Sequence, residues 1–184
     1  CDHEGLSGYC LEDALGFMAQ KPQIYVTSRV VGADAGYALP VQVVTSHALQ
    51  ALFSDNMFRP VPADINRSIF RDKGFYLVQM PFDRLDASRY EGRLRKMPDG
   101  KTSGMAVAMD FDRRIGVIIG SGYCGSLKKM IFTVMNYYLP LEGILPLHCS
   151  ANEGKNGDSA LLLGLSGTGK TSLSADPERA LLGD

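Results

Sequence analysis

Apolar residues alternate between strand-like and helix-like spacing along the chain. Short runs rich in β-branched and aromatic residues predict strands over residues 23–31, 41–45, 75–80, 105–111, 115–119 and 159–163. Helical spacing predicts helices over residues 11–20 and 127–138, and Pro140 is expected to stop the second of these. Glycine and polar residues predict turns at 32–36 and 112–114. Because strands alternate with helices, the pattern predicts an α/β or α+β fold.

A further helix is predicted directly after the strand over residues 41–45. Ser46 is of the residue type that caps helix N-termini, and the helix is expected to run through Phe53. Helical spacing puts Ala48, Leu49, Leu52 and Phe53 on one side of it.

Composition limits the classes of protein. The 184 residues are 45% hydrophobic and 21% charged, which is typical of a globular chain. The 19 basic and 20 acidic residues give a net charge of -1, so a generally polycationic nucleic-acid binder is excluded. The balanced charge gives no reason to expect a nucleic-acid partner. No apolar run has the length of a membrane span, so no membrane partner is expected either. Four cysteines without a Cys-x-x-Cys pair favour reduced thiols in a cytoplasmic protein.

One segment carries a specific chemical signature. Residues 164–171 read Gly-Leu-Ser-Gly-Thr-Gly-Lys-Thr and match the P-loop pattern G-x-x-x-x-G-K-[ST] at every fixed position. An apolar run leads into this loop and a helical pattern leads out of it. Glycines allow successive backbone N–H groups to turn towards phosphate oxygens. Lys170 would supply positive charge to the β and γ phosphates, and the Thr171 hydroxyl would hold Mg²⁺.

Two other clusters hold candidate polar groups. Residues 120–129 form a glycine-rich loop that ends in Lys128 and Lys129, which fits an anion site and an ordinary turn equally well. His148 lies in the run Leu-His-Cys-Ser-Ala-Asn over 147–152, where a structural histidine is the commoner outcome. Residues 83–101 mix both signs of charge, which favours a solvated surface segment over a phosphate-binding patch.

These motifs together resemble the ATP-dependent phosphoenolpyruvate carboxykinases. The resemblance rests on Tyr123, Gly125, Lys128 and Lys129 in the Tyr-x-Gly-x-x-Lys-Lys loop, on the His-Cys-Ser-Ala-Asn run over 148–152, and on the P-loop wording over 164–171. It extends over most of the chain and is weakest from about residue 61 to 99.

The resemblance implies a fold and a reaction. Residues 1–143 would be the later part of the family's mixed α+β N-terminal domain, and residues 144–184 would begin its P-loop nucleotide-binding domain. The reaction would be decarboxylation of oxaloacetate and phosphorylation of the enolate by ATP. Phosphoenolpyruvate, ADP and CO₂ would result, in gluconeogenesis.

The resemblance also implies roles for individual residues. Lys129 and His148 would be Mn²⁺ ligands that also contact ATP, while Tyr123 and Lys129 would contact the carboxylate substrate. Lys170 would be catalytic with these two, and Thr171 would hold the Mg²⁺ that accompanies ATP. The ATP phosphates would be held by the loop and the start of its helix, that is, by Gly164, Leu165, Ser166, Gly167, Thr168, Gly169, Lys170, Thr171 and Ser172.

The chain departs from the family pattern at several points. Ser126 stands where the family usually has Glu, and Ser172 where it often has Thr. The family's metal-ligand aspartate would directly follow Asp184, and its substrate-binding arginine would precede Cys1. An internal fragment, inactive when isolated, is therefore expected. Two alternatives stay open: a non-catalytic P-loop nucleotide-binding module, and another P-loop kinase that acts on a small acid.

Overall fold

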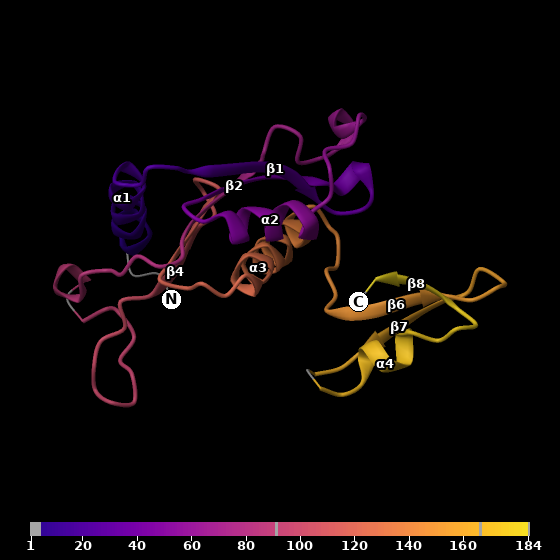
Figure 1. The fold of residues 1–184 in the computed structure, drawn as a ribbon. Helices are drawn as coiled ribbons and strands as arrows, with labels where there is room; N and C mark the ends of the chain where they lie inside the picture. Colours follow the sequence, from indigo (N-terminus) through magenta and orange to yellow (C-terminus); the bar gives the residue numbers. More distant parts are fainter. Residues whose placement is uncertain (1–4, 91, 166, 184) are drawn as a thin grey trace. The chain divides into compact units, whose positions relative to one another are not determined.

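The structure, a computed structural model, describes residues 5–90, 92–165 and 167–183. The chain divides into two compact units, Cys1–Val134 and Met135–Asp184 (Figure 1). Their boundary falls inside helix α3 (Gly125–Leu141). The predicted domain boundary after residue 143 stays a prediction. No helix in the described ranges combines the length and the apolar character that crossing a bilayer requires.

The first unit is built around a mixed five-stranded sheet with the order β1-β2-β3-β5-β4. The strands are β1 (Tyr25–Val31), β2 (Leu39–Thr45), β3 (Phe75–Met80), β4 (Ala106–Asp110) and β5 (Ile115–Ile119). The outer pairs β1–β2 and β4–β5 are antiparallel, and β3 runs parallel to both of its neighbours. The predicted strands and the α/β class are thereby confirmed. Three short 3₁₀ helices lie between these elements, at Ala35–Tyr37, Ile65–Arg67 and Ala87–Tyr90.

Helices cover the two faces of this sheet. Helix α1 (Leu6–Ala19) buries Cys10 and Ala14 in one cluster with Val78 and Met80 of β3 and with residues of β5. The opposite face carries α2 (Ala48–Met57) and the first turns of α3, as Figure 1 shows. On that face an added side chain at Gly116 would come within 2.2 Å of the Met130 sulfur of α3, so α3 packs closely on β5 there and any larger residue would have to displace Met130.

The N-terminus of α2 differs from its prediction. The N-cap residue is His47, not Ser46, and no side chain caps the helix. The first helical bond runs from the Ala51 N–H to the His47 carbonyl, which fixes the start of the helix one residue later than predicted.

The buried side of α2 is not the apolar side that spacing indicated. Gln50, Ala51 and Ser54 are buried, whereas Leu49 and Leu52 are 54% and 60% exposed. Polar anchors set this orientation: the hydroxyls of Ser54 and Thr27 of β1 lie 2.7 Å apart, and Gln50 bonds a loop beyond the sheet. Hydrogen bonds to neighbouring elements thus hold the buried side of α2, and two leucines are left exposed.

Helix α3 continues past the residue that was expected to stop it. Pro140 lies inside the helix, which ends at Leu141. Gly143 then adopts φ 75°, and the Ile144 N–H bonds the Leu139 carbonyl at 3.0 Å. The helix is therefore ended by a glycine in the left-handed conformation and not by the proline. The bond from Ile144 gives the Leu139 carbonyl, near Pro140, a hydrogen-bond donor that lies after the helix.

The charged segment over residues 83–101 is solvated only in part. Tyr90 is fully buried, and its hydroxyl donates to Oδ2 of Asp13 in α1 at 2.7 Å. Arg89 forms an ion pair with the same aspartate. Burial, followed by the bond to Asp13, raises the pKa of Tyr90, and burial likewise raises the pKa of the neighbouring Cys10 thiol. This cluster fixes α1 to the segment that follows β3.

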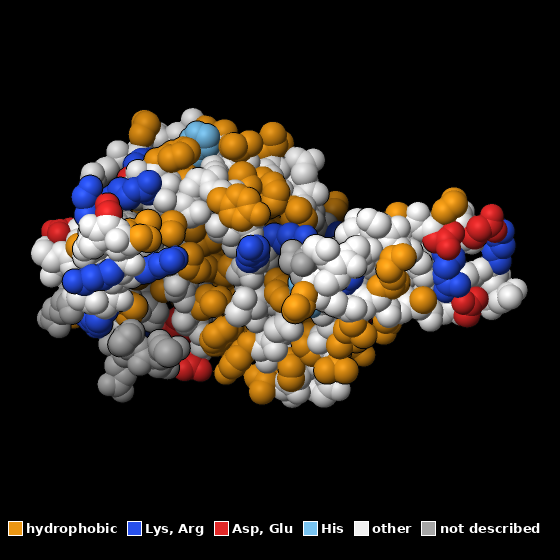
Figure 2. All heavy atoms as spheres, turned by 90° about the horizontal axis from the view of Figure 1, so that it is seen from below, with side chains coloured by type: hydrophobic (Ala, Val, Ile, Leu, Met, Phe, Trp, Pro, Cys, Tyr) orange, Lys and Arg blue, Asp and Glu red, His pale blue; other side chains and the backbone are white. Residues whose placement is uncertain are grey.

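The second unit holds a small antiparallel sheet with the order β7-β6-β8. Its elements are β6 (Cys149–Glu153), β7 (Ser159–Leu163), α4 (Lys170–Ser174) and β8 (Ala180–Gly183). The strand predicted over 159–163 and the helix start predicted at Lys170 are confirmed. Figure 2 shows acidic and basic side chains gathered at one end of this unit, where Lys155 pairs with Glu178 and Arg179 with Asp158.

Candidate functional site

The P-loop segment has the local structure that its sequence predicts. Strand β7 ends at Leu163, the loop follows, and α4 begins at Lys170. Gly167 and Gly169 adopt φ 79° and 87°, in the left-handed region where glycine is strongly favoured. Ser166 lies outside the described residues.

The Lys170 side chain folds back over its own loop. Its Nζ donates to the carbonyl oxygens of Gly164 at 2.8 Å and of Leu165 at 2.9 Å. The Thr168 hydroxyl donates to the same Leu165 carbonyl at 2.7 Å. An added side chain at Gly164 would come within 2.6 Å of the Thr168 hydroxyl oxygen. An ammonium group has three donors, so the Lys170 amine can hold the loop and still offer a donor to an anion.

Thr171 and Ser172, the remaining predicted phosphate contacts, lie in the first turn of α4 and are exposed. The Thr171 carbonyl accepts hydrogen bonds from the Ser174 hydroxyl at 3.1 Å and from the Ala175 N–H at 3.1 Å. The two residues therefore adjoin the loop and face solvent.

The strand register brings His148 beside this loop. In the antiparallel pair β6–β7, Cys149 is opposite Leu163. His148 directly precedes Cys149, and Gly164 directly follows Leu163, so the pairing brings the histidine next to the first residue of the P-loop. The His148 side chain is exposed. Two motifs that are 16 residues apart thus meet at one edge of the small sheet.

A polar anchor behind the P-loop is not evident from the sequence. Asn152 of β6 is buried, and its amide nitrogen donates to the Ser174 carbonyl at the end of α4 at 3.1 Å. Its Oδ1 accepts from Arg179 Nε at 2.7 Å. Arg179 also bonds Asp158 at 2.8 Å, and this bond, with the arginine's charge, lowers the pKa of that carboxyl group. The sequence could have indicated this anchor only through the asparagine itself, a polar residue at an inward-facing position of a strand.

In the first unit, the structure brings Tyr123 and Lys129 together. Tyr123 is 64% exposed, and the Lys129 Nζ lies 6.0 Å from the centre of its ring, within reach of a cation–π contact. An added side chain at Gly125 would come within 2.4 Å of the Tyr123 ring, so the ring lies directly over this glycine. A tyrosine hydroxyl and a lysine ammonium group are both donors that can bind a carboxylate.

Ser126, which stands where the resemblance predicts glutamate, bonds within its own loop. Its hydroxyl lies 3.1 Å from the Ser121 hydroxyl, and its N–H donates to the Tyr123 carbonyl at 3.1 Å. No ion pair to Lys129 occurs among the described residues. The serine therefore leaves the Lys129 amine without a carboxylate partner in this part of the chain.

The predicted metal site is not assembled within either unit. Lys129 belongs to the first unit and His148 to the second. Within residues 5–90, 92–165 and 167–183, no three His, Cys, Asp or Glu side chains form a metal-binding group. The Mn²⁺ and Mg²⁺ ligands therefore stay predictions.

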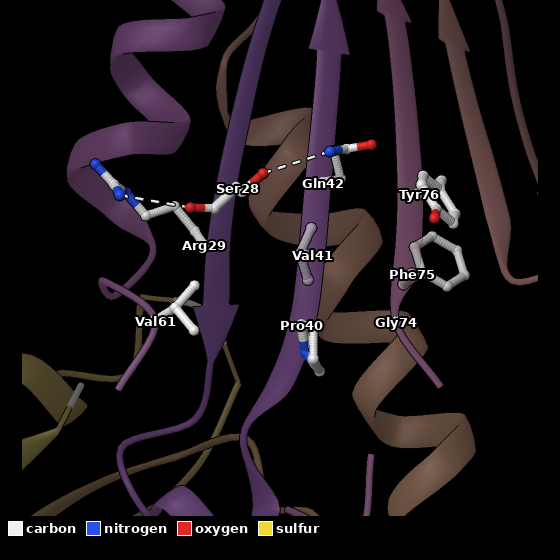
Figure 3. A pocket seen from close by; sticks show the side chains of 9 residues that line it. All are labelled: Ser28, Arg29, Pro40, Val41, Gln42, Val61, Gly74, Phe75 and Tyr76. Atoms are coloured by element: carbon white, nitrogen blue, oxygen red, sulfur yellow. Dashed lines mark hydrogen bonds between the residues drawn. The ribbon is translucent and has the colours of Figure 1, made fainter. Parts of the chain in front are cut away.

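A surface hollow lies elsewhere in the first unit, on β1, β2 and β3 (Figure 3). Val41 and Phe75 form part of its wall, and Gln42 Nε2 donates to the Ser28 hydroxyl at 3.4 Å. The Arg29 side chain at its rim is paired with Asp55. This hollow contains none of the predicted site residues.

Comparison with known proteins identifies the family. The family model described as "Phosphoenolpyruvate carboxykinase" matches residues 7–184. This chain belongs to the ATP-dependent phosphoenolpyruvate carboxykinase family. The resemblance seen in the sequence is thereby confirmed.

Individual relatives agree with this family. The chain is 42% identical to the phosphoenolpyruvate carboxykinase (ATP) of Mesorhizobium japonicum over 94% of its length and 30% of the relative's. Identity is 40% to the enzyme of that name from Bacillus cereus, over 92% of this chain and 30% of the relative. The chain is 45% identical to the phosphoenolpyruvate carboxykinase (ATP) of Thermus thermophilus, over 88% of this chain and 29% of the relative. The chain thus spans about 30% of the length of the curated relatives it matches.

Proposed function

We propose that the full-length protein is an ATP-dependent phosphoenolpyruvate carboxykinase, acting in the cytoplasm in gluconeogenesis. Oxaloacetate loses CO₂, and the electron pair of the broken carbon–carbon bond remains in the enolate. The enolate oxygen attacks the γ-phosphorus of ATP, and ADP leaves with the bridging oxygen. The family membership and the P-loop wording over residues 164–171 support this function.

One observation carries the proposal: the register of β6 and β7, which brings His148 next to Gly164. A P-loop alone is shared by many nucleotide-binding proteins. A histidine beside its first residue adds a group that could bind a metal ion close to a nucleotide's phosphates. This combination favours a phosphoryl-transfer enzyme over a module that only binds nucleotide.

Different residues of the chain would bind the two substrates. The amides over residues 164–172 and the Lys170 amine hold the phosphates and stabilise negative charge on the transferred group. The Tyr123 hydroxyl and the Lys129 amine bind and orient the carboxylate of oxaloacetate. In each set one donor has local contacts: Lys170 is tied to two loop carbonyls, and the Tyr123 ring packs on Gly125.

The donor chemistry fits a metal ion. Lys129 and His148 would hold Mn²⁺ through an amine and an imidazole nitrogen, and Thr171 would hold Mg²⁺ through its hydroxyl. Lysine ligates a metal only as the neutral amine, so binding of Mn²⁺ would displace a proton from Lys129. The lack of an ion pair to Lys129 in the described ranges leaves its amine available. A bound divalent cation would stabilise enolate charge and phosphate charge.

The experiment measures phosphoenolpyruvate formation by the full-length protein from oxaloacetate, ATP and Mn²⁺. Lys170→Ala is expected to reduce kcat by about 10²–10³-fold, as removal of one charge-stabilising donor does elsewhere. Lys155→Ala, which removes an exposed lysine of the same unit outside the P-loop, serves as the control. ATP binding without phosphoenolpyruvate formation would instead favour a non-catalytic nucleotide-binding module.

A further inference from the structure

Three successive carbonyl groups directly before Tyr123 each accept a hydrogen bond from a side chain of another element. The donors come from α2, from β3 and from the segment after β3. The bonds are Gln50 Nε2 to Gly122 O at 3.0 Å, Gln79 Nε2 to Ser121 O at 2.9 Å, and Arg84 Nη1 to Gly120 O at 2.5 Å. We call Gln50, Gln79 and Arg84 the carbonyl clamp.

Two members of the carbonyl clamp are polar side chains in the core. Gln50 and Gln79 are fully buried, at positions where a helix and a central strand normally carry apolar residues. Gln79 Oε1 has no hydrogen-bond partner in the described part of the chain, which costs stability. An apolar residue would avoid that cost, so core packing alone does not explain a glutamine here.

The backbone of the clamped loop is also fixed sterically. Gly120 adopts φ 80°, and an added side chain would come within 2.7 Å of Arg84 Nη1 and 3.1 Å of the Met105 Cα. An added side chain at Gly122 would lie 3.1 Å from the Phe82 ring. The loop therefore has little freedom, because side-chain donors and close contacts hold it from several directions.

The clamped loop leads straight into the candidate carboxylate site. Tyr123 follows Gly122, its ring packs over Gly125, and the Lys129 amine lies over that ring. The Gln50 Oε1 is itself held by His47 Nδ1 at 3.0 Å, which fixes the amide orientation of one clamp residue. A shift of residues 120–122 would thus move the Tyr123 hydroxyl and the surroundings of the Lys129 amine.

We infer that the carbonyl clamp consists of positioning residues, which fix the loop that presents Tyr123 and Lys129 to the carboxylate substrate. The inference rests on the proposed function for the identity of that substrate. The clamp residues do not touch the substrate themselves. They act through the backbone of residues 120–122, and their effect on the carboxylate is expected to exceed their effect on ATP, because the P-loop belongs to the other unit.

The test replaces each buried amide by methionine, which keeps its length and removes its donors, in the full-length protein. Gln50→Met and Gln79→Met are expected to raise KM for oxaloacetate at least about tenfold and to lower kcat, because small displacements at a reacting centre cost large factors in rate. The dissociation constant for ATP is expected to change much less than KM for oxaloacetate, since the P-loop is untouched.

Gln42→Met is the matched control. Gln42 is a partly buried glutamine of the same sheet, and its side chain donates to Ser28 of β1, not to residues 120–122 (Figure 3). Arg84 is exposed, so Arg84→Met provides a second variant if a core variant fails to fold. Folded variants with wild-type KM for oxaloacetate would overturn the inference, and so would an equal loss of ATP affinity.

Amide hydrogen exchange separates this inference from the proposed function. The amides of residues 123–127 are expected to exchange faster in the clamp variants than in Gln42→Met, whatever reaction the protein catalyses. Faster exchange in the clamp variants, together with no phosphoenolpyruvate formation by the wild type, would refute the proposed function. It would still support the role of the carbonyl clamp in fixing the loop. Unchanged exchange in the clamp variants would refute the clamp itself.

Discussion

Asn152 donates a hydrogen bond to the Ser174 carbonyl oxygen at 3.1 Å, and this bond joins the central strand of the second unit to the end of the P-loop helix. The same side chain accepts from Arg179. A short helix that follows a phosphate-binding loop has few contacts of its own, so this buried amide determines where the helix ends. The position of the P-loop thus depends on a residue that does not belong to it.

Asn152→Ala is therefore expected to lower both stability and ATP affinity. Leaving the partners of a buried amide unsatisfied costs about 1–3 kcal/mol. The measurements are the urea midpoint of unfolding and the dissociation constant for ATP in the full-length protein. Asn156→Ala is the control, since Asn156 is exposed in the turn between β6 and β7. Equal effects of the two substitutions would contradict the role of Asn152.

Gly120→Ala is expected to destabilise the protein more than Gly100→Ala. Both glycines have nearly the same backbone conformation, with φ 80° and 81°. Each substitution therefore costs about 1–2 kcal/mol for the left-handed conformation alone. At Gly100 no atom lies within 4 Å of the added carbon, whereas at Gly120 it meets Arg84 and the Met105 backbone. The difference between the urea midpoints of the two variants measures the cost of the steric contacts at Gly120. Equal midpoints would mean that the loop relaxes around the added carbon and would contradict the prediction.

The Cys10 thiol is expected to react slowly with iodoacetamide in the folded protein. Burial raises its pKa, so little of it is thiolate at neutral pH, and the side chain is only 1% exposed. Its alkylation rate at pH 7–8 should lie well below that of the denatured chain, and mass spectrometry of labelled peptides measures both. Cys124 and Cys149, which are only partly buried, provide an internal comparison. Cys10 labelling as fast as that of these two would contradict the packing of α1.

The ion pair of Asp158 with Arg179 is expected to make the stability of the second unit depend on pH. Arg179 lowers the pKa of this carboxyl group, so the pair contributes stability that is fully present above the ordinary aspartate pKa. That contribution is lost as pH falls through the lowered folded-state pKa. The difference in melting temperature between wild type and Asp158→Asn should therefore be largest near neutral pH and shrink below about pH 4. A difference that grows as the pH falls would have the wrong sign for this pair.

The sequence was sufficient to predict most strands and the P-loop, because both depend on local signals. Alternation and β-branched residues identify β3 and β5, and the glycine spacing identifies the loop before Lys170. The buried side of α2 could not be predicted in this way. Its orientation depends on hydrogen bonds from Gln50 and Ser54 to elements distant in sequence, and periodicity contains no information about them.

The buried polar anchors were missed for the same physical reason. Tyr90 lies in a segment whose charges indicate a solvated surface, yet its ring is buried against α1. Gln79 lies in a predicted strand, whereas the strand that holds Asn152 was not predicted at all. A polar residue at an inward strand position signals a buried hydrogen bond, but its partner is known only when the fold is known.

The transfer of phosphate from ATP to the enolate is the central claim, and isotope labelling tests it most directly. The full-length protein is incubated with ATP carrying ³²P in its γ-phosphate, Mn²⁺ and oxaloacetate, and the labelled products are separated. The account predicts label in phosphoenolpyruvate that depends on oxaloacetate and is abolished in Lys170→Ala. Label found only in inorganic phosphate, or label in phosphoenolpyruvate that is unaffected by loss of the Lys170 amine, would contradict it.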